Sequence, residues 1–114
     1  DVLNQMASCL HGEMNCATFA ASGDQSISTN RYIDKAHFFY DGSSLVFEIE
    51  ANAFLWKMVR SIVGSLIHFE KTGKDAEFFK SVVESCDRKK AGPTAPPNGL
   101  FLYKISFDGI RRHV

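Results

Sequence analysis

The sequence predicts an α+β domain in which helices pack on one face of an antiparallel sheet. Segments 31–40 and 45–51 are rich in aromatic and β-branched residues, and Asp41 with Gly42 between them forms a dipeptide typical of a two-strand turn. Segments 54–71 and 75–86 carry apolar residues at helical spacing. No second run of core residues is visible, so residues 1–114 are expected to form a single domain.

The composition narrows the classes of protein that the chain can represent. Thirteen basic and thirteen acidic residues give a formal net charge of zero, which does not by itself indicate a nucleic-acid-binding protein. Lys57, Arg60 and His68 interrupt the longest apolar run, so no membrane span is expected. The three cysteines lack paired CxxC spacing and the four histidines are scattered, which predicts reduced thiols, a cytosolic protein and no metal site.

The N-terminal third is predicted to hold one helix and one long loop. Apolar residues recur every three or four positions from Asp1 to about His11, and Gly12 is expected to end this helix. Residues 13–29 are mostly small or polar and predict a loop. Phe19 is its one large apolar residue near the middle and is expected to anchor the loop on the core, with stacking on a nucleic-acid base as the alternative.

The predicted strands have one buried and one solvent-exposed face. In the segment 45–51, Leu45, Phe47, Ile49 and Ala51 share one face, and Glu48 and Glu50 share the other. The two glutamates are therefore interpreted as the solvent side of a strand rather than as a pair of acid and base groups. The segment 100–107 alternates in the same way and predicts a final strand.

The segment from Phe54 to about Lys71 predicts a helix buried between layers, because its apolar residues fall on nearly every side. Arg60 lies within this segment and requires an anionic partner, since an unpaired buried guanidinium would cost several kcal/mol or more. Gly64 follows one turn later and is expected to permit the close approach of another backbone or a ligand. Gly73 is expected to end the helix.

The C-terminal third begins with a second helix and continues with a basic and a proline-rich stretch. Asp75 is expected to cap this helix, which runs to about Cys86. Its predicted buried face consists of Phe78, Phe79, Val82 and Val83. Arg88, Lys89 and Lys90 form a basic triplet that is either a solvated surface or a set of phosphate contacts.

Three stretches of the chain resemble TruA-type tRNA pseudouridine synthases, in the same order. EANAFLWKMVRSIVGSL at 50–66 resembles the FLxxMVRxIVG segment of that family, and TAPPNGLFL at 94–102 resembles its TAPxxGLxL stretch. Upstream, Gly12, Glu13 and Thr18 with Phe19 resemble its GExxFxxF loop. The resemblance therefore covers nearly the whole chain.

The resemblance implies a cytoplasmic, homodimeric isomerase that needs no cofactor and converts uridine to pseudouridine in the anticodon stem-loop of tRNA. In the family, the arginine at the position of Arg60 pairs with the catalytic aspartate. Leu100 or a neighbour is expected to supply an apolar wall for the uracil, Phe19 is a weaker candidate for substrate contact, and residues 88–90 are expected to contact phosphates.

The aspartate of the family lies in a GRTDAG-like motif, which does not occur in this sequence. We therefore expect residues 1–114 to be the C-terminal part of such an enzyme, with half of an active site and no activity alone. Arg60 is then expected to face solvent or to use a substitute acceptor. Two alternatives are a non-catalytic RNA-binding or dimerisation module and a plain scaffold in which Arg60 pairs with Glu48 or Glu50.

Overall fold

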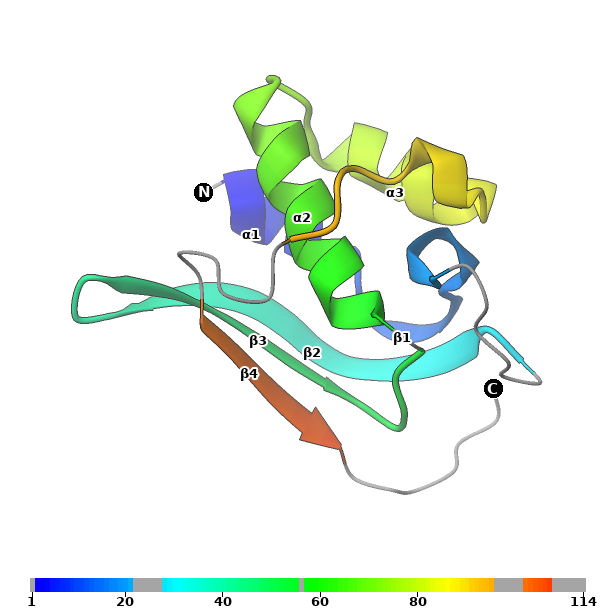
Figure 1. The fold of residues 1–114 in the computed structure, drawn as a ribbon, viewed down its shortest axis with the longest axis horizontal. Helices are drawn as coiled ribbons and strands as arrows, with labels where there is room; N and C mark the ends of the chain where they lie inside the picture. The colour runs from blue at the N-terminus through cyan, green and yellow to red at the C-terminus, as the bar shows by residue number, and fades with distance from the viewer. Residues whose placement is uncertain (1, 22–27, 56, 96–101, 108–114) are drawn as a thin grey trace.

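The computed structural model describes residues 2–21, 28–55, 57–95 and 102–107, the last range as main chain only (Figure 1). Three α-helices, four strands and two short 3-10 helices follow one another along these ranges. In chain order they are α1 (Val2–Ala7), β1 (Gly12–Asn15), the 3-10 helix η1 (Ala17–Phe19), β2 (Asn30–Asp41), β3 (Ser44–Ala51), α2 (Met58–Lys71), α3 (Ala76–Ser85), the 3-10 helix η2 (Arg88–Lys90) and β4 (Leu102–Phe107).

The strands form one sheet in the order β1-β2-β3-β4, and the helices lie together on one of its faces (Figure 1). The predicted α+β class is confirmed: β1, β2 and β3 run antiparallel. β4 adds to β3 in the parallel direction. A parallel neighbour needs a long crossover connection, which the segment containing α2 and α3 provides.

The β2–β3 hairpin has the predicted buried face. Phe38 pairs with Phe47 and Ala36 with Ile49, so these residues point toward the helices. Phe47, Ile49 and Ala51 are completely buried. Asp41 pairs with Ser44, which makes residues 42–43 the two-residue turn.

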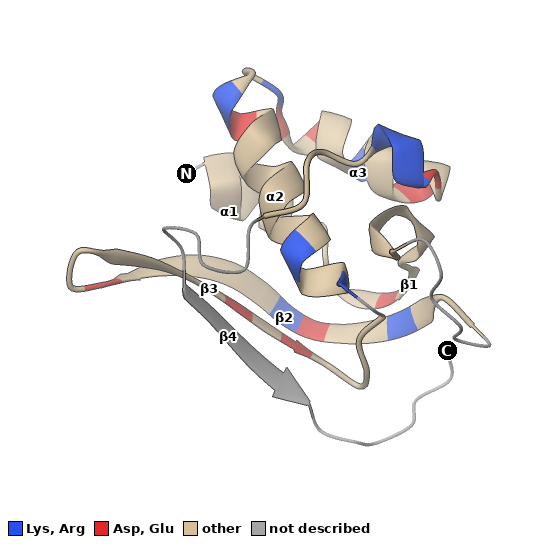
Figure 2. Ribbon diagram, in the orientation of Figure 1, with Lys and Arg blue, Asp and Glu red and all other residues tan. Residues whose placement is uncertain are grey.

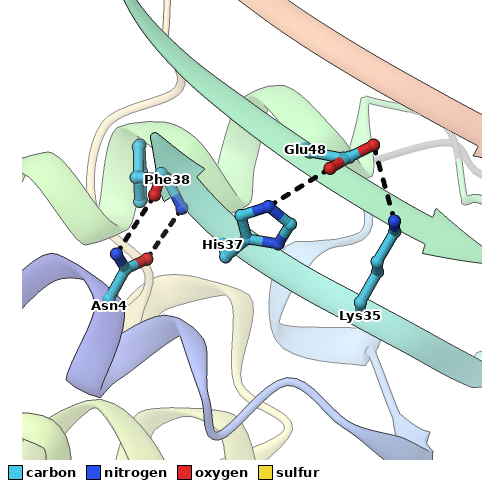
Figure 3. A network of polar contacts seen from close by, with 5 residues as sticks. All are labelled: Asn4, Lys35, His37, Phe38 and Glu48. Carbon is cyan, nitrogen blue, oxygen red and sulfur yellow. Dashed lines mark hydrogen bonds and ion pairs between the residues drawn. The ribbon is translucent and has the colours of Figure 1, made fainter. Parts of the chain in front are cut away.

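Glu48 is buried, contrary to the expectation that it faces solvent, and only 7% of the residue is exposed. It lies on the sheet face away from the helices, but β3 is an inner strand whose neighbours β2 and β4 cover it from both sides. Its carboxylate lies 3.6 Å from Lys35 Nζ and 3.2 Å from His37 Nε2 (Figure 3). The residue is thus part of a polar cluster on the outer face of the sheet.

The N-terminal segment departs from the prediction in two respects. Helix α1 ends at Ala7, and Gly12 begins strand β1 instead of ending the helix. The residues predicted to form one long loop include β1, which pairs with the N-terminal end of β2, and η1. β1 has only one large apolar residue, Met14, so its sequence gives little indication of a strand.

Beyond the part of β2 that β1 covers, a side chain takes the place of a strand. β1 pairs only with residues 30–33 of β2. Farther along, Asn4 of α1 donates from Nδ2 to the carbonyl of Phe38 at 3.1 Å, and its Oδ1 accepts from the Phe38 amide at 2.7 Å (Figure 3). These are the two hydrogen bonds that a neighbouring strand would make to that residue.

Helix α2 packs beside α1 on the helical side of the sheet (Figure 1). It begins at Met58, four residues later than predicted, because the preceding Lys57 adopts a left-handed conformation with φ of 60°. It ends before Gly73, whose φ of 78° agrees with the predicted helix end. Its buried residues are Met58, Val59, Ser61, Ile62, Val63, Ser65, Leu66 and Phe69.

Helix α3 is capped as predicted, since Asp75 Oδ1 accepts a hydrogen bond from the Phe78 amide at 2.9 Å. Phe79, Val82 and Val83 are buried in the core. Phe78 was expected there too, but it is 37% exposed and packs edge-on against Phe69, with ring centroids 5.1 Å apart. Phe78 lies at the margin of the apolar stripe of a ten-residue helix, where solvent reaches one side of the ring.

The three cysteines are free, as expected for reduced thiols. Cys16 is buried, and burial raises the pKa of its thiol to about 12. The helices of the described ranges include none that is long and apolar enough to cross a membrane.

Candidate active site around Arg60

Arg60 lies in the first turn of α2 and is half-buried. Its Nε donates to the carbonyl oxygen of Ala95 at 3.0 Å. A main-chain carbonyl is thus one acceptor of the guanidinium. Neither of the two ion pairs found among the described residues involves Arg60. Of the two glutamates named in the scaffold alternative, Glu48 pairs instead with Lys35 and His37.

The carbonyl that Arg60 contacts belongs to an extended segment, residues 92–95, which we call the strap and which crosses α2 (Figure 1). The Ala95 amide donates to the carbonyl of Arg60 at 3.0 Å, in addition to the side-chain contact. At the other end of the strap, the Gly92 amide donates to Ser65 Oγ at 2.9 Å. Hydrogen bonds therefore hold both ends of the strap on the helix.

Gly64 is the place where the strap and α2 come closest. A Cβ atom built on Gly64 would lie 1.8 Å from the carbonyl oxygen of Pro93 and 2.7 Å from the amide nitrogen of Ala95. Both distances are far below van der Waals contact. The prediction that Gly64 permits another backbone to approach is confirmed, and that backbone is the strap.

The contact to Ala95 determines which N–H donors of the guanidinium remain for another ligand. An arginine side chain carries five N–H donors, one on Nε and four on the two terminal nitrogens. Ala95 takes the Nε donor. The edge formed by Nη1 and Nη2 is the part of a guanidinium that can bind both oxygens of a carboxylate or phosphate end-on.

Phe19 and its neighbour fasten the segment after β1 to α3. Thr18 Oγ1 donates to the carbonyl of Val82 at 3.0 Å. Phe19 is completely buried and stacks on Phe79, with ring centroids 5.9 Å apart. This burial fits the interpretation of Phe19 as an anchor, because contact with a base would require the ring to leave the core.

The basic triplet forms η2, which follows α3 and precedes the strap. Asp87 Oδ1 accepts from the Lys89 amide at 3.0 Å and so caps this short helix. Arg88 is half-buried, and its Nη2 donates to Thr94 Oγ1 in the strap at 3.3 Å. Lys89 and Lys90 are exposed. Within the triplet, Arg88 thus contacts the strap, whereas the two lysines face solvent.

Leu100, expected to form an apolar wall for uracil, lies outside the described residues. Three residues of the site were missed by sequence reasoning. Ser65 contacts the strap, and Thr94 and Ala95 lie in it. One signal for them was present in the sequence: a glycine within a helix, followed by a proline-rich segment that cannot form secondary structure of its own and has to lie on a surface.

Comparison with known proteins agrees with the resemblance. A family model described as tRNA pseudouridine synthase matches residues 6–108. The tRNA pseudouridine synthase A of Treponema denticola is 61% identical over 105 residues, which cover 92% of this chain and 39% of the relative. Those of Treponema pallidum (strain Nichols) and Borreliella burgdorferi (strain B31) are 48% and 40% identical and cover 81% and 93% of the chain. The chain spans 33% and 43% of the length of these two relatives.

Proposed function

The chain belongs to the tRNA pseudouridine synthase family, and on this premise we propose that it is the C-terminal part of an enzyme that isomerises uridine to pseudouridine in the anticodon stem-loop of tRNA. The observation that carries the proposal is the placement of Arg60. Its Nε donates to the carbonyl of Ala95 in the strap, which supports the proposal that the Nη1 and Nη2 edge binds an anion. In the proposed active site, that anion is the catalytic aspartate from a part of the protein outside this sequence.

The proposed role of Arg60 is to hold this carboxylate ionised and correctly oriented. The isomerisation breaks the bond between C1′ of the ribose and N1 of uracil and joins the same C1′ to C5 of the base. C5 loses its hydrogen as a proton and N1 gains one, so the product is an isomer of the substrate. Charge-assisted hydrogen bonds from a planar guanidinium favour the ionised carboxylate and fix its direction. The uridine must also leave the base stack to reach these groups. Leu100 is proposed to form an apolar wall beside the base.

Comparison of the 114-residue chain with the full-length protein tests this assignment. We expect the full-length protein to form pseudouridine in tRNA and the chain alone to form none, because the nucleophile is outside it. The product is measured by mass spectrometry of digested tRNA. Turnover by the pure chain would contradict the proposed division of the site.

The control for this experiment is the full-length protein with the aspartate of its GRTDAG-like motif changed to alanine. This variant is expected to bind tRNA but to form no pseudouridine. A full-length protein that binds tRNA without modifying it would instead support the alternative of a non-catalytic RNA-binding module.

We propose that Lys89 and Lys90 contact tRNA phosphates, because both are exposed on η2, directly before the strap (Figure 2). The double variant Lys89→Ala with Lys90→Ala should weaken tRNA binding by the full-length protein. The slope of log affinity against log salt concentration should decrease in magnitude by about 1 to 2, since each lost phosphate contact releases about one counterion fewer. Filter binding at several salt concentrations measures this slope.

The matched control replaces two other exposed lysines, Lys71 and Lys74, which lie near the opposite end of α3. This control removes the same net charge and is expected to leave the slope close to that of the unaltered protein. Equal slopes for the two double variants would show that η2 makes no particular contact with the phosphates.

We also propose that the full-length protein is a cytoplasmic homodimer and that it binds tRNA. The family resemblance supports this proposal, and multi-angle light scattering of the full-length protein tests the dimer. A monomeric mass at micromolar concentration would contradict it.

A further inference from the structure

We propose that Gly64 is a positioning residue for Arg60. Its missing side chain lets the strap lie directly on α2, where Ala95 fixes the guanidinium so that it meets its carboxylate end-on, through Nη1 and Nη2. This inference rests on the proposed function. It adds a residue one turn away from the arginine and a direction of approach for the catalytic carboxylate.

The first argument is that the strap holds Arg60 by two atoms at once. The Ala95 amide donates to the carbonyl of Arg60, and Nε of Arg60 donates to the carbonyl of Ala95, both at 3.0 Å. One residue of the strap therefore contacts the main chain and the side chain of the arginine. The position of the guanidinium depends on the position of Ala95, because a free arginine side chain adopts many rotamers.

The second argument is that only glycine fits at position 64. A Cβ atom there would lie 1.8 Å from the Pro93 carbonyl oxygen, whereas real Cβ contacts remain above 3.0 Å. The atoms it would meet belong to the main chain of the strap, which cannot rotate aside as a flexible side chain does. Any larger residue at position 64 must move Pro93 and Ala95 away from the helix. Glycine is otherwise unfavourable within a helix, so its presence here agrees with a requirement for this close contact.

The third argument concerns the direction from which the carboxylate arrives. A carboxylate can bind a guanidinium either side-on, through Nε and one terminal nitrogen, or end-on, through both terminal nitrogens. The carbonyl of Ala95 occupies the Nε donor. Because Nε is occupied, both carboxylate oxygens can be bound only through Nη1 and Nη2. The strap therefore determines that the carboxylate binds end-on.

The test is the variant Gly64→Ala in the full-length enzyme, measured under single-turnover conditions with enzyme in saturating excess over tRNA. We expect the rate of pseudouridine formation to fall by about 100-fold, since a displacement of about 1 Å at a reacting group costs that much. The dissociation constant for tRNA should change by less than about threefold, because the phosphate contacts are kept. A rate within about threefold of the unaltered enzyme would overturn the inference.

Ser65→Ala provides a milder second variant in case Gly64→Ala does not fold. It removes the hydroxyl that accepts from the Gly92 amide at 2.9 Å and loosens the other end of the strap. We expect a rate reduction of about 10-fold, as for the loss of one hydrogen bond. The matched control is Ser81→Ala, an exposed serine of α3 whose hydroxyl bonds to the carbonyl of Phe78 in its own helix. This control should keep the full rate, and equal rates for the two serine variants would contradict the inference.

Two further readouts separate positioning from a general loss of structure. Misfolded enzyme would reduce the amount of tRNA bound but not the single-turnover rate of the bound fraction. In addition, solvent exchange of the Arg60 Nε hydrogen, followed by NMR, should be faster in Gly64→Ala than in the unaltered protein. Equal exchange would overturn the inference whether or not the protein modifies tRNA. An unaltered full-length enzyme without activity, but with the expected difference in exchange, would instead contradict the proposed function and leave the positioning role in place.

Discussion

Arg60→Lys should reduce pseudouridine formation by the full-length enzyme about 100-fold or more, because orientation of a reacting group accounts for effects of this size. A lysine has neither the Nε donor that reaches Ala95 nor the two parallel donors that match a carboxylate. Its ammonium group keeps the charge but not the planar geometry. The variant therefore separates the effect of the positive charge from the effect of the guanidinium geometry.

Activity is measured on saturating tRNA, with the melting temperature of each variant recorded alongside. The control is the reverse exchange at an exposed position, Lys74→Arg, which keeps the net charge and lies outside the site. It is expected to retain full activity. If Arg60→Lys also retained a near-normal rate, Arg60 would have no place in the active site.

Phe19→Ala should lower the free energy of unfolding by about 3 to 5 kcal/mol, the range found when a buried phenylalanine is truncated. Phe19 is completely buried and stacks on Phe79. Alanine leaves a cavity beside Phe79 that the surrounding helices can fill only in part. Urea denaturation followed by circular dichroism gives the change, and the exposed Tyr40→Ala should remain within about 0.5 kcal/mol of the unaltered protein.

Phe19→Leu distinguishes the two interpretations of this residue. As a core anchor, Phe19 can be replaced by leucine at a cost below that of the alanine variant, and activity on tRNA should follow stability. As a stacking partner for a base, it requires an aromatic ring. A stable Phe19→Leu enzyme that no longer modifies tRNA would therefore favour the base-stacking role.

The parts of the fold that were predictable are those specified by residues close together in the sequence. The hairpin is indicated by alternation in β3 and by the dipeptide Asp41-Gly42, which lies where β2 meets the turn. Helix α3 is indicated by its apolar stripe and by the cap at Asp75. The close approach at Gly64 could be anticipated because a glycine inside a helix needs a reason. Each of these signals is local.

The parts that could not be predicted depend on contacts between distant segments. The parallel direction of β4 depends on the path of the chain after α3, and the burial of Glu48 depends on β4 lying beside β3. The strap has no periodicity, so its position appears only when α2 is in place. For the same reason, sequence reasoning identified Arg60 and its need for an acceptor but not the acceptor itself, which lies 35 residues farther along the chain.

The contact between Asn4 and Phe38 bears on how this sheet avoids growth by addition of foreign strands. An uncovered strand edge offers unpaired amides and carbonyls that another polypeptide can join, which leads to aggregation. The amide side chain of Asn4 satisfies both groups of Phe38 along the edge of β2 that lies beyond β1. One side chain of a six-residue helix, too short to be stable by itself, thus closes this edge to foreign strands at Phe38.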